Sequence, residues 1–391
     1  MGASARRCVS CVCGGQAKSG DAASCAAPGF WPAPFDGGAM ILLTLTFVVA
    51  VLLAMYGVPI ARRAALKFGI VDNPDGRLKH QREPVPYLGG LAIYLAFLVS
   101  LAFTFEFRQD VLGIVLSGTL IVMLGLIDDF GVLSPGTKLA GQFLAVFVLI
   151  KSGIRIEIAS LPDWLDLVLT VLWMIGIINA FNLLDIMDGL SAGVGIISAA
   201  FLCVVAVLNG DQTIAFMLAA LMGSLLGFLR YNWRPASIYM GDSGAMFIGL
   251  MLGALSMIGK YTEGHSVSLL TPVLILGMPI FDTLFVMYIR FLRGLPIFLG
   301  SPDHMAIRLR HWGLSVPQVV LVSYLGAALL GGIGLLVMAV PQDLALGLSG
   351  LTVMGLGVAA VALTRVNVSG GVVAVSRKAV PARSTERTGA V

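Results

Sequence analysis

Two adjacent aspartates, Asp128 and Asp129, end an apolar run that begins near Val111. A charged group at the centre of a bilayer is costly, so such residues lie at helix ends or in wet cavities and are usually functional. Neighbouring carboxylates repel each other unless a cation or a proton neutralises one of them. The pair therefore indicates metal or proton chemistry, with a solvated helix end just outside a membrane as the alternative.

A second polar cluster contains Asn179, Asn182, Asp185 and Asp188, which are spaced three residues apart. On a continuous helix this spacing puts each neighbouring pair on one face. Amides and carboxylates arranged in this way could hold a sugar, a ribose or a hydrated cation. The alternative is a polar seam between two helices, but two aspartates make a purely structural seam expensive.

The third cluster runs from Arg230 to Gly244 and ends in a Gly-Asp-Ser-Gly sequence. Its glycines, Gly241 and Gly244, would permit close backbone approach to a ligand. Asp242 stands where the next apolar helix begins, so it is either a helix N-cap or a ligand for a hard cation such as magnesium. Tyr239 could stack on a base or anchor the chain at the membrane interface.

The fourth cluster combines Asp303 and His304 with Arg308, and a basic segment around Arg82 precedes the second apolar stretch. Clustered arginine and histidine suit phosphate groups. Loops on the cytoplasmic side of a membrane protein are basic for a different reason, so the number of arginines does not decide between the two interpretations.

The composition determines which elements must position these clusters. Hydrophobic residues make up 58% of the 391-residue chain and charged residues only 12%, which excludes a soluble domain. We therefore expect an all-α, polytopic bundle of transmembrane helices. Apolar stretches of membrane-spanning length predict about eleven spans, near 41–60, 88–106, 111–127, 139–153, 165–184, 190–208, 214–229, 244–259, 269–289, 318–340 and 344–364.

The distribution of lysine and arginine predicts the orientation of this bundle. Segments after odd-numbered stretches, together with the C-terminal tail, hold eighteen of these residues, whereas segments after even-numbered stretches hold four, namely Arg108, Lys151, Arg155 and Lys260. Because positive loops stay in the cytoplasm, the N-terminus is predicted outside and the C-terminus inside. All four polar clusters then face the cytoplasm.

The two ends of the chain differ from the apolar region. Residues 1–39 are rich in Ala, Gly, Ser and Cys and precede Met40; we expect a disordered extension, or a misassigned start with Met40 as the initiator. Residues 40–366 are predicted to form the integral membrane domain. Residues 367–391 are basic and of low complexity, and we expect a disordered cytoplasmic tail near anionic lipid.

Taken together, five motifs resemble the polyprenyl-phosphate N-acetylhexosamine-1-phosphate transferase family. They are PVPYLGG, GLIDDFGVLSPGTKLAGQ, NAFNLLDIMDGLSAG, YNWRPASIYMGDSGAMFIG and SPDHMAIRL, and they occur in family order between about residues 70 and 315. The resemblance implies that a sugar 1-phosphate, such as GlcNAc-1-phosphate, passes from a UDP-sugar to polyprenyl phosphate, giving UMP. It also implies a multi-pass protein of the bacterial cytoplasmic membrane, with its active site on the cytoplasmic face, that initiates a cell-envelope polysaccharide.

The resemblance also implies a role for particular residues. The essential aspartate pair corresponds to Asp128 and Asp129, with Lys138 as the nearby lysine. Asp242 would hold Mg²⁺, with Asp129 as a second ligand in our interpretation and Mn²⁺ as an alternative ion. His304 is the further catalytic candidate, as a clamp for phosphate. The candidates for substrate binding are Arg82, Asn182, Asp185, Asp188, Asn232, Tyr239 and Arg308.

The sequence departs from the family pattern at two positions. Ile186 replaces the common glycine between the two aspartates of the second cluster, and Ile307 stands where many relatives carry another histidine. The chain also lacks a triple-histidine run, which argues against a MurNAc-pentapeptide substrate. The expected partners are a UDP-N-acetylhexosamine and polyprenyl phosphate, without nucleic acid, and a second copy of the chain in a homodimer is a further candidate partner. The competing interpretation is a transporter or lipid flippase, because intramembrane acids also serve proton relays.

Overall fold

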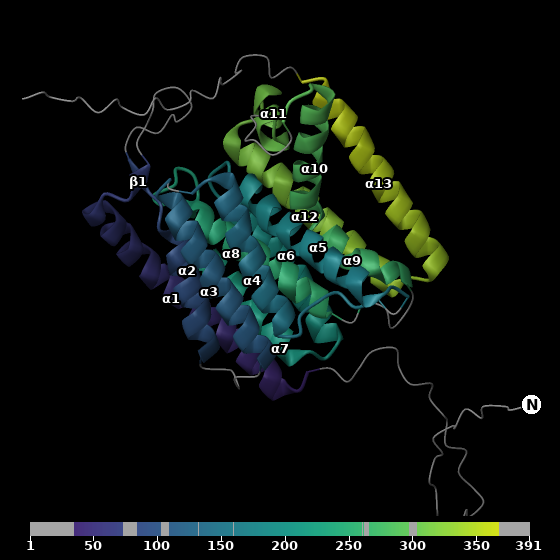
Figure 1. The fold of residues 1–391 in the computed structure, drawn as a ribbon, viewed down its shortest axis with the longest axis horizontal. Coiled ribbons are helices and arrows are strands. Elements are labelled where there is room, and N and C mark those ends of the chain that lie inside the picture. Colours follow the sequence, from purple (N-terminus) through teal and green to yellow (C-terminus); the bar gives the residue numbers. More distant parts are fainter. Residues whose placement is uncertain are drawn as a thin grey trace, which may run out of the picture.

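The computed structural model describes residues 35–72, 84–102, 109–131, 133–158, 160–259, 261, 266–296 and 303–366. These residues form a helical bundle (Figure 1) with one small antiparallel sheet of strands β1 (Val71–Asp72) and β2 (Val85–Pro86). The helices are α1 (Gly37–Phe68), α2 (Gly89–Ala102), α3 (Gln109–Asp129), α4 (Pro135–Lys151), α5 (Asp163–Leu184), α6 (Leu190–Leu208), α7 (Gln212–Asn232), α8 (Gly241–Ile258), η1 (Ser266–Leu270), α9 (Thr271–Ile275), α10 (Gly277–Leu292), α11 (Met305–His311), α12 (Val316–Ala339) and α13 (Gln342–Thr364).

Local capping signals set several of the helix ends. Asp36 accepts a hydrogen bond from the Ala39 backbone N–H (2.7 Å) and starts α1 slightly before the predicted boundary at residue 40. Ser134 caps α4, whose first residue is a proline. Side-chain oxygens at these positions satisfy backbone N–H groups that have no partner within the helix. Residues 1–34 and 367–391, where we expect disorder, lie outside the described residues.

The all-α, multi-pass membrane architecture is confirmed, but the predicted count of eleven spans is not. Among the described residues, eight helices are long and apolar enough to cross a membrane, and the pair η1–α9 and α10, bent by 78°, gives up to nine. Helices α2 and α4 occupy two of the predicted stretches but contain only 14 and 17 residues. At ~1.5 Å per residue, α2 spans roughly 21 Å of a hydrocarbon core about 30 Å thick.

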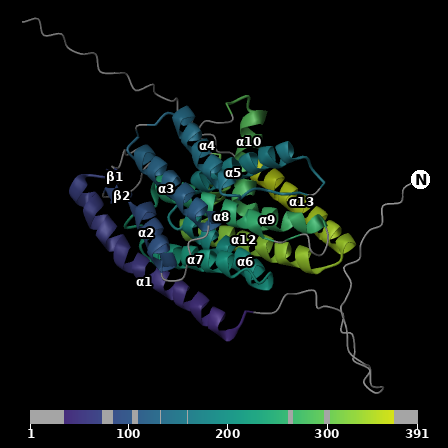
Figure 2. The ribbon, with the colours of Figure 1, turned by 60° about the horizontal axis from the view of Figure 1, so that its bottom comes forward.

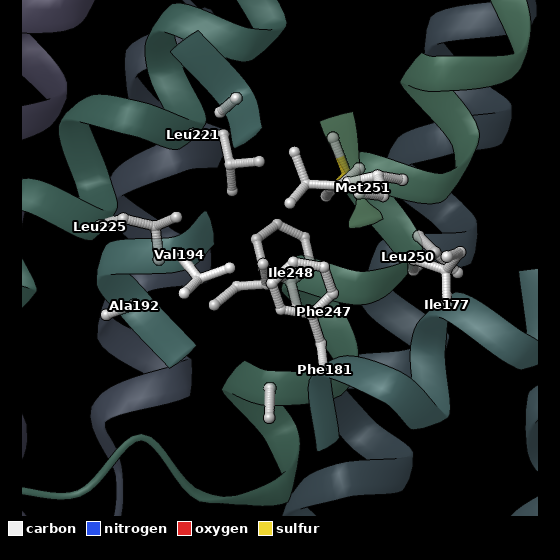
Figure 3. Close-up of a cluster of buried hydrophobic side chains, with 14 of the residues drawn as sticks. Ile177, Phe181, Ala192, Val194, Leu221, Leu225, Phe247, Ile248, Leu250 and Met251 are labelled. Atoms are coloured by element: carbon white, nitrogen blue, oxygen red, sulfur yellow. The ribbon is translucent and has the colours of Figure 1, made fainter. Parts of the chain in front are cut away.

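Helix α8 lies at the centre of the bundle. In its most apolar stretch 78% of the residues are buried, against 22% in α1 and 17% in α13, and these two helices lie at opposite margins of the molecule (Figure 2). The hydrophobic core around α8 includes Phe247 and Ile248, with Phe181 of α5, Val194 of α6 and Leu225 of α7 (Figure 3). A rigid central helix can hold the residues at its first turn in a fixed position.

Close backbone contacts fix the first turn of α8 against its neighbours. A Cβ atom added at Gly90 of α2 would collide with the backbone of Gly244, and one at Gly125 of α3 would collide with the backbone of Ser243. Glycine is therefore required at Gly90 and Gly244 so that two helices can approach each other, as small residues permit in membranes. The sequence analysis had assigned Gly244 to ligand contact; its close approach to Gly90 gives a packing reason for this glycine.

We expect Gly90→Ala to destabilise the bundle by about 1–3 kcal/mol, because the new methyl group meets backbone atoms that cannot rotate away. The measurement is thermal unfolding of the purified protein in detergent. Gly176→Ala on α5 is the matched control, since no atom lies within 4 Å of its added Cβ. Equal melting temperatures for the two variants would contradict the packing argument.

The ends of many helices meet at one side of the bundle. Helices α1, α3, α5 and α7 end there, and α2, α4, α6 and α8 begin there, as the hydrogen bonds among their terminal residues require. This end lies near β1 in Figure 1. The alternation is the one that the sequence predicted, and it brings three of the four polar clusters to one surface.

Candidate active site

The ammonium group of Lys138 lies at the centre of a polar cluster at this end of the bundle. Its Nζ atom is 2.7 Å from Asp128 Oδ2 and 2.8 Å from Asp242 Oδ2. It also donates a hydrogen bond to Asn182 Oδ1 (2.9 Å), while Asn182 Nδ2 donates to Asp242 Oδ1 (2.7 Å). Four residues from α3, α4, α5 and α8 therefore share one interaction network, although they are far apart in the sequence.

Asp129 stabilises the start of α8. Its Oδ1 accepts the backbone N–H of Asp242 (2.7 Å) and its Oδ2 that of Ser243 (3.4 Å). A carboxylate at a helix N-terminus accepts hydrogen bonds from backbone N–H groups that have no partner within the helix, and its negative charge interacts favourably with the positive end of the helix dipole. Gly241, at φ 74°, lies so close that an added Cβ would contact the carboxylate of Asp129. Close approach to Asp129 and the positive φ both require glycine here.

This arrangement separates the two interpretations of Asp242. The residue at the N-cap position of α8 is Met240, and no side chain of the helix itself provides a cap hydrogen bond. Because Asp129 supplies that cap, the carboxylate of Asp242 faces Lys138 and Asn182. The interpretation of Asp242 as a helix cap is therefore wrong.

The second cluster does not form a single helical face. Helix α5 ends at Leu184, so Asp185 and Asp188 lie in the turn that leads to α6. Asp188 Oδ2 accepts the backbone N–H of Ala236 (3.2 Å) and so joins this turn to the loop before α8. Burial, together with the nearby charges of Asp242, Asp129 and Asp188, raises the pKa of Asp185 to about 8. The protonated form of a carboxyl group, which a raised pKa favours, can donate as well as accept hydrogen bonds.

Asn232 and Tyr239 support the loop before α8. The Asn232 side chain is buried, accepts the Gly189 N–H (2.9 Å) and donates to the Ile238 carbonyl (3.0 Å). The Tyr239 backbone N–H donates to the Pro86 carbonyl (2.8 Å), and its carbonyl accepts from Gly89 (3.0 Å). The backbone N–H groups of Gly89 and Gly90 thus donate to the carbonyls of Tyr239 and Met240 within the protein.

These residues surround a cavity of about 1100 Å³, at or above the size usual for small-molecule sites. Six aspartates and two arginines are among its described lining residues: Asp72, Asp128, Asp129, Asp185, Asp188, Asp242, Arg62 and Arg234. Asn232, Tyr239 and Ile186 line it as well. An acidic cavity repels phosphate groups, so a phosphorylated ligand would need a cation to bind there. Arg82 lies outside the described residues.

His304 and Arg308 do not line this cavity. The guanidinium group of Arg308 is buried, donates from Nη2 to Asp303 Oδ1 (2.7 Å) and donates from Nη1 to the carbonyls of Leu363 (3.1 Å) and Val366 (2.9 Å). Arg308 therefore binds the C-terminal end of α13, where a positive charge also interacts favourably with the negative end of the helix dipole. These contacts favour a structural role over the predicted contact with substrate.

The predicted substrate contact of Arg308 can be tested against this structural role. We expect Arg308→Met to destabilise the protein by about 3–5 kcal/mol, because it leaves the buried Asp303 with one partner fewer, and to leave the KM for the nucleotide substrate unchanged. Arg310→Met, an exposed position on the same helix, is the control. A raised KM with unchanged thermal stability would restore the substrate-binding interpretation.

The sequence analysis missed a buried carboxylate beside His304. Asp282 lies in α10, 2% exposed, with its Oδ2 2.8 Å from His304 Nδ1 and its Oδ1 accepting the Met305 N–H (2.7 Å). This pairing fixes which ring nitrogen of His304 faces the carboxylate. The signal was present, since Asp282 is an acidic residue inside a predicted apolar span.

Comparison with known proteins identifies the family. The family model for glycosyl transferase family 4 matches residues 111–260. A probable undecaprenyl-phosphate N-acetylglucosaminyl 1-phosphate transferase of Bacillus subtilis (strain 168) is 36% identical over 295 residues, which cover 73% of this chain and 82% of the relative. The chain belongs to glycosyl transferase family 4. The resemblance seen in the motifs is thus confirmed.

Two further relatives show the range of this family. A decaprenyl-phosphate N-acetylglucosaminephosphotransferase of Mycolicibacterium smegmatis is 33% identical over 321 residues, covering 72% of this chain and 79% of the relative. A phospho-N-acetylmuramoyl-pentapeptide-transferase of Halalkalibacterium halodurans is 34% identical over 302 residues, covering 70% and 90%. All three family relatives are named as transferases of phosphorylated sugars, which gives no support to the transporter interpretation.

The predicted magnesium site is compatible with the oxygen atoms around Lys138. No group of three or more His, Cys, Asp or Glu side chains that could hold a metal occurs within the described ranges. Magnesium, however, usually binds through one or two carboxylates, with waters and substrate phosphates as its other ligands. Asp128 and Asp242 form such a carboxylate pair, and their Oδ2 atoms both contact the Lys138 ammonium. Asp129, whose oxygens accept two N–H groups, would be at most a further ligand.

Proposed function

We propose that this protein transfers a sugar 1-phosphate, such as GlcNAc-1-phosphate, from a UDP-N-acetylhexosamine to polyprenyl phosphate. The observation that carries the proposal is the network in which Lys138 joins Asp128, Asp242 and Asn182, located beside an acidic cavity in a chain of this family. The lipid-linked product would start a cell-envelope polysaccharide. A membrane-embedded lipid and a soluble nucleotide can both reach the end of a helical bundle.

The reaction exchanges one phosphorus–oxygen bond for another. An oxygen of the lipid phosphate attacks the β-phosphorus of the UDP-sugar, and the bond from that phosphorus to the bridging oxygen breaks. The products are polyprenyl-diphospho-sugar and UMP. Such reactions depend mainly on alignment of the reactants and on stabilisation of phosphoryl charge. The cavity supplies the alignment, because its walls come from several helices held by α8.

Each residue of the network has a distinct task in this proposal. Lys138 provides an ammonium group that can exchange its ion pairs with the carboxylates for an ion pair with a substrate phosphate. Asp242 holds the cation together with Asp128, which is also the candidate acceptor for the proton that the lipid phosphate carries. Asn182 fixes the position of the Asp242 carboxylate through its amide group. Asp185, Asp188 and Tyr239 line the part of the cavity where the nucleotide would lie.

Magnesium is the proposed cofactor, with Asp242 and Asp128 as its closest protein ligands. Asp129, which the sequence analysis predicted as a ligand, is a further candidate. When bound, the ion would neutralise the phosphate charge that the acidic cavity otherwise repels. Manganese offers the same preference for oxygen ligands.

The direct test is incorporation of radiolabelled sugar from UDP-GlcNAc into the lipid extract, with purified protein, polyprenyl phosphate and magnesium. We expect a diphosphate-linked lipid and equimolar UMP, and no product with EDTA. UDP-GalNAc and UDP-MurNAc-pentapeptide, assayed in parallel, identify the sugar. Absence of lipid-linked product with every UDP-sugar would refute the proposal.

We propose that the end of the bundle that carries the cavity faces the cytoplasm. The motive is the asymmetric distribution of lysine and arginine, eighteen on the side of the cavity and the C-terminal tail against four on the other, because positive loops stay in the cytoplasm. With native cysteines replaced by serine, a membrane-impermeant maleimide on intact cells should label Trp164→Cys and Gln342→Cys at the opposite end. It should not label Phe130→Cys or Arg310→Cys. The reverse pattern would invert the orientation.

A further inference from the structure

A second polar layer lies directly beneath the Lys138 network and uses three of its four helices, namely α4, α5 and α8. Gln142 follows Lys138 by one turn on α4, Asn179 precedes Asn182 by one turn on α5, and Met246 follows Asp242 by one turn on α8. The Asn179 Nδ2 donates to Gln142 Oε1 (2.8 Å), and the Gln142 Nε2 contacts Asn179 Oδ1 (3.4 Å) and Met246 Sδ (3.3 Å). The two amides thus bind each other reciprocally.

Neither amide of this pair lines the cavity. Gln142 is fully buried and Asn179 is half-buried. Burial of an amide in an apolar environment costs free energy that its hydrogen bonds only offset. An apolar pair of the same size would serve packing at least as well, so the amides require an explanation other than stability.

The surroundings of α4 supply that explanation. On the α3 side, Gly141 packs against Leu124, where an added Cβ would collide with the leucine side chain. The outer face of α4 is apolar and exposed, with Phe143 and Phe147 among its residues. In the described part of the chain, the side-chain hydrogen bonds between α4 and α5 come from the two polar layers alone. Apolar packing alone would permit α4 to rotate slightly against α5, whereas the reciprocal amide hydrogen bonds form at one relative position of the two helices.

We propose that Gln142 and Asn179 are positioning residues, which fix the rotation of α4 against α5 and thereby hold the Lys138 ammonium among the oxygens of the active site. The inference rests on the proposed function for its effect on turnover, but the placement of Lys138 can be measured without any activity. A displacement of about 1 Å in a catalytic group can cost up to about a hundredfold in rate.

The experiment compares Gln142→Leu, Asn179→Leu and the double variant with wild type in two assays. The first is kcat and KM for the transfer. The second is acetylation of Lys138 by a water-soluble N-hydroxysuccinimide ester, followed by mass spectrometry, with the exposed Lys151 of the same helix as the internal reference. Tyr94→Phe is the matched control, because it removes a partly buried hydrogen bond between α2 and α3, which joins Tyr94 OH and Thr119 Oγ1 (2.7 Å). Gln142→Met, of equal length, replaces any leucine variant that does not fold.

We expect each of the three variants to lower kcat by about tenfold or more, with KM unchanged, and to raise the ratio of Lys138 to Lys151 acetylation severalfold. Because the amides act as a pair, the double variant should cost no more than either single one. Tyr94→Phe should change neither quantity. An acetylation ratio equal to that of wild type would overturn the proposal, as would an equal rise in Tyr94→Phe. If wild type transfers no sugar, the proposed function fails, and the acetylation ratio alone decides on the positioning role.

Discussion

Asp242→Asn is expected to lower the transfer rate by about a thousandfold without a loss of folded protein. The Asp242 carboxylate pairs with Lys138 at 2.8 Å and accepts from Asn182 at 2.7 Å. Two unit charges at about 4 Å interact by roughly 4 kcal/mol at an effective dielectric constant near 20, and about 4 kcal/mol corresponds to about a thousandfold in rate. The start of α8 should persist, because the Asp129 carboxylate caps it from α3.

The measurement is transfer as a function of magnesium concentration, for wild type and variant, with thermal unfolding alongside. If Asp242 binds the cofactor, the variant curve shifts to higher magnesium, and excess ion recovers part of the rate. Asp163→Asn, which neutralises an exposed carboxylate at the opposite end of the bundle, should match wild type. Superimposable curves for Asp242→Asn and wild type would remove Asp242 from the cation site.

The membrane architecture followed from composition and apolar periodicity, whereas the lengths of α2 and α4 did not. Apolarity identified both stretches as spans, but hydropathy does not register that α2 is short and buried against α8 through Gly90. The sequence also did not predict the bend between α9 and α10, because an apolar run has the same hydropathy whether its helix is straight or broken. The sequence therefore predicted the fold class better than the number of crossings.

At the active site, the sequence predicted the residue types and the end of the bundle at which they lie. It did not predict which side chains contact each other. Asp128, Lys138, Asn182 and Asp242 were all candidates before the structure was known, but sequence spacing cannot show that one ammonium group joins the other three. Asp129 looked equivalent to Asp128 in the sequence. Adjacent residues on a helix point ~100° apart, and only the packing of α4 and α8 decides that Asp128 contacts Lys138 while Asp129 caps α8. Arg308 looked like a phosphate ligand, because its partners at the end of α13 are 55 and 58 residues away.

Lys138→Met is expected to reduce transfer by about a hundredfold to a thousandfold and, in the absence of substrate, to strengthen the binding of a divalent cation. The Lys138 ammonium lies within 3 Å of oxygens from Asp128, Asp242 and Asn182, so it competes for the oxygens that a cation would use. Its removal leaves two carboxylates whose mutual repulsion favours a bound cation. The same change removes the positive charge that stabilises the transferred phosphoryl group.

Binding of Mn²⁺ to substrate-free protein, followed by electron paramagnetic resonance, measures the first effect separately from turnover. Lys151→Met makes the same substitution at the other end of α4, where the ammonium lies over the Phe147 ring, and should alter neither quantity. Tighter Mn²⁺ binding combined with slow transfer is the pattern that the shared oxygens require. If Lys138→Met binds Mn²⁺ no more tightly than wild type does, the ammonium and the cation occupy different places, and the metal ligands must be sought among Asp129, Asp185 and Asp188.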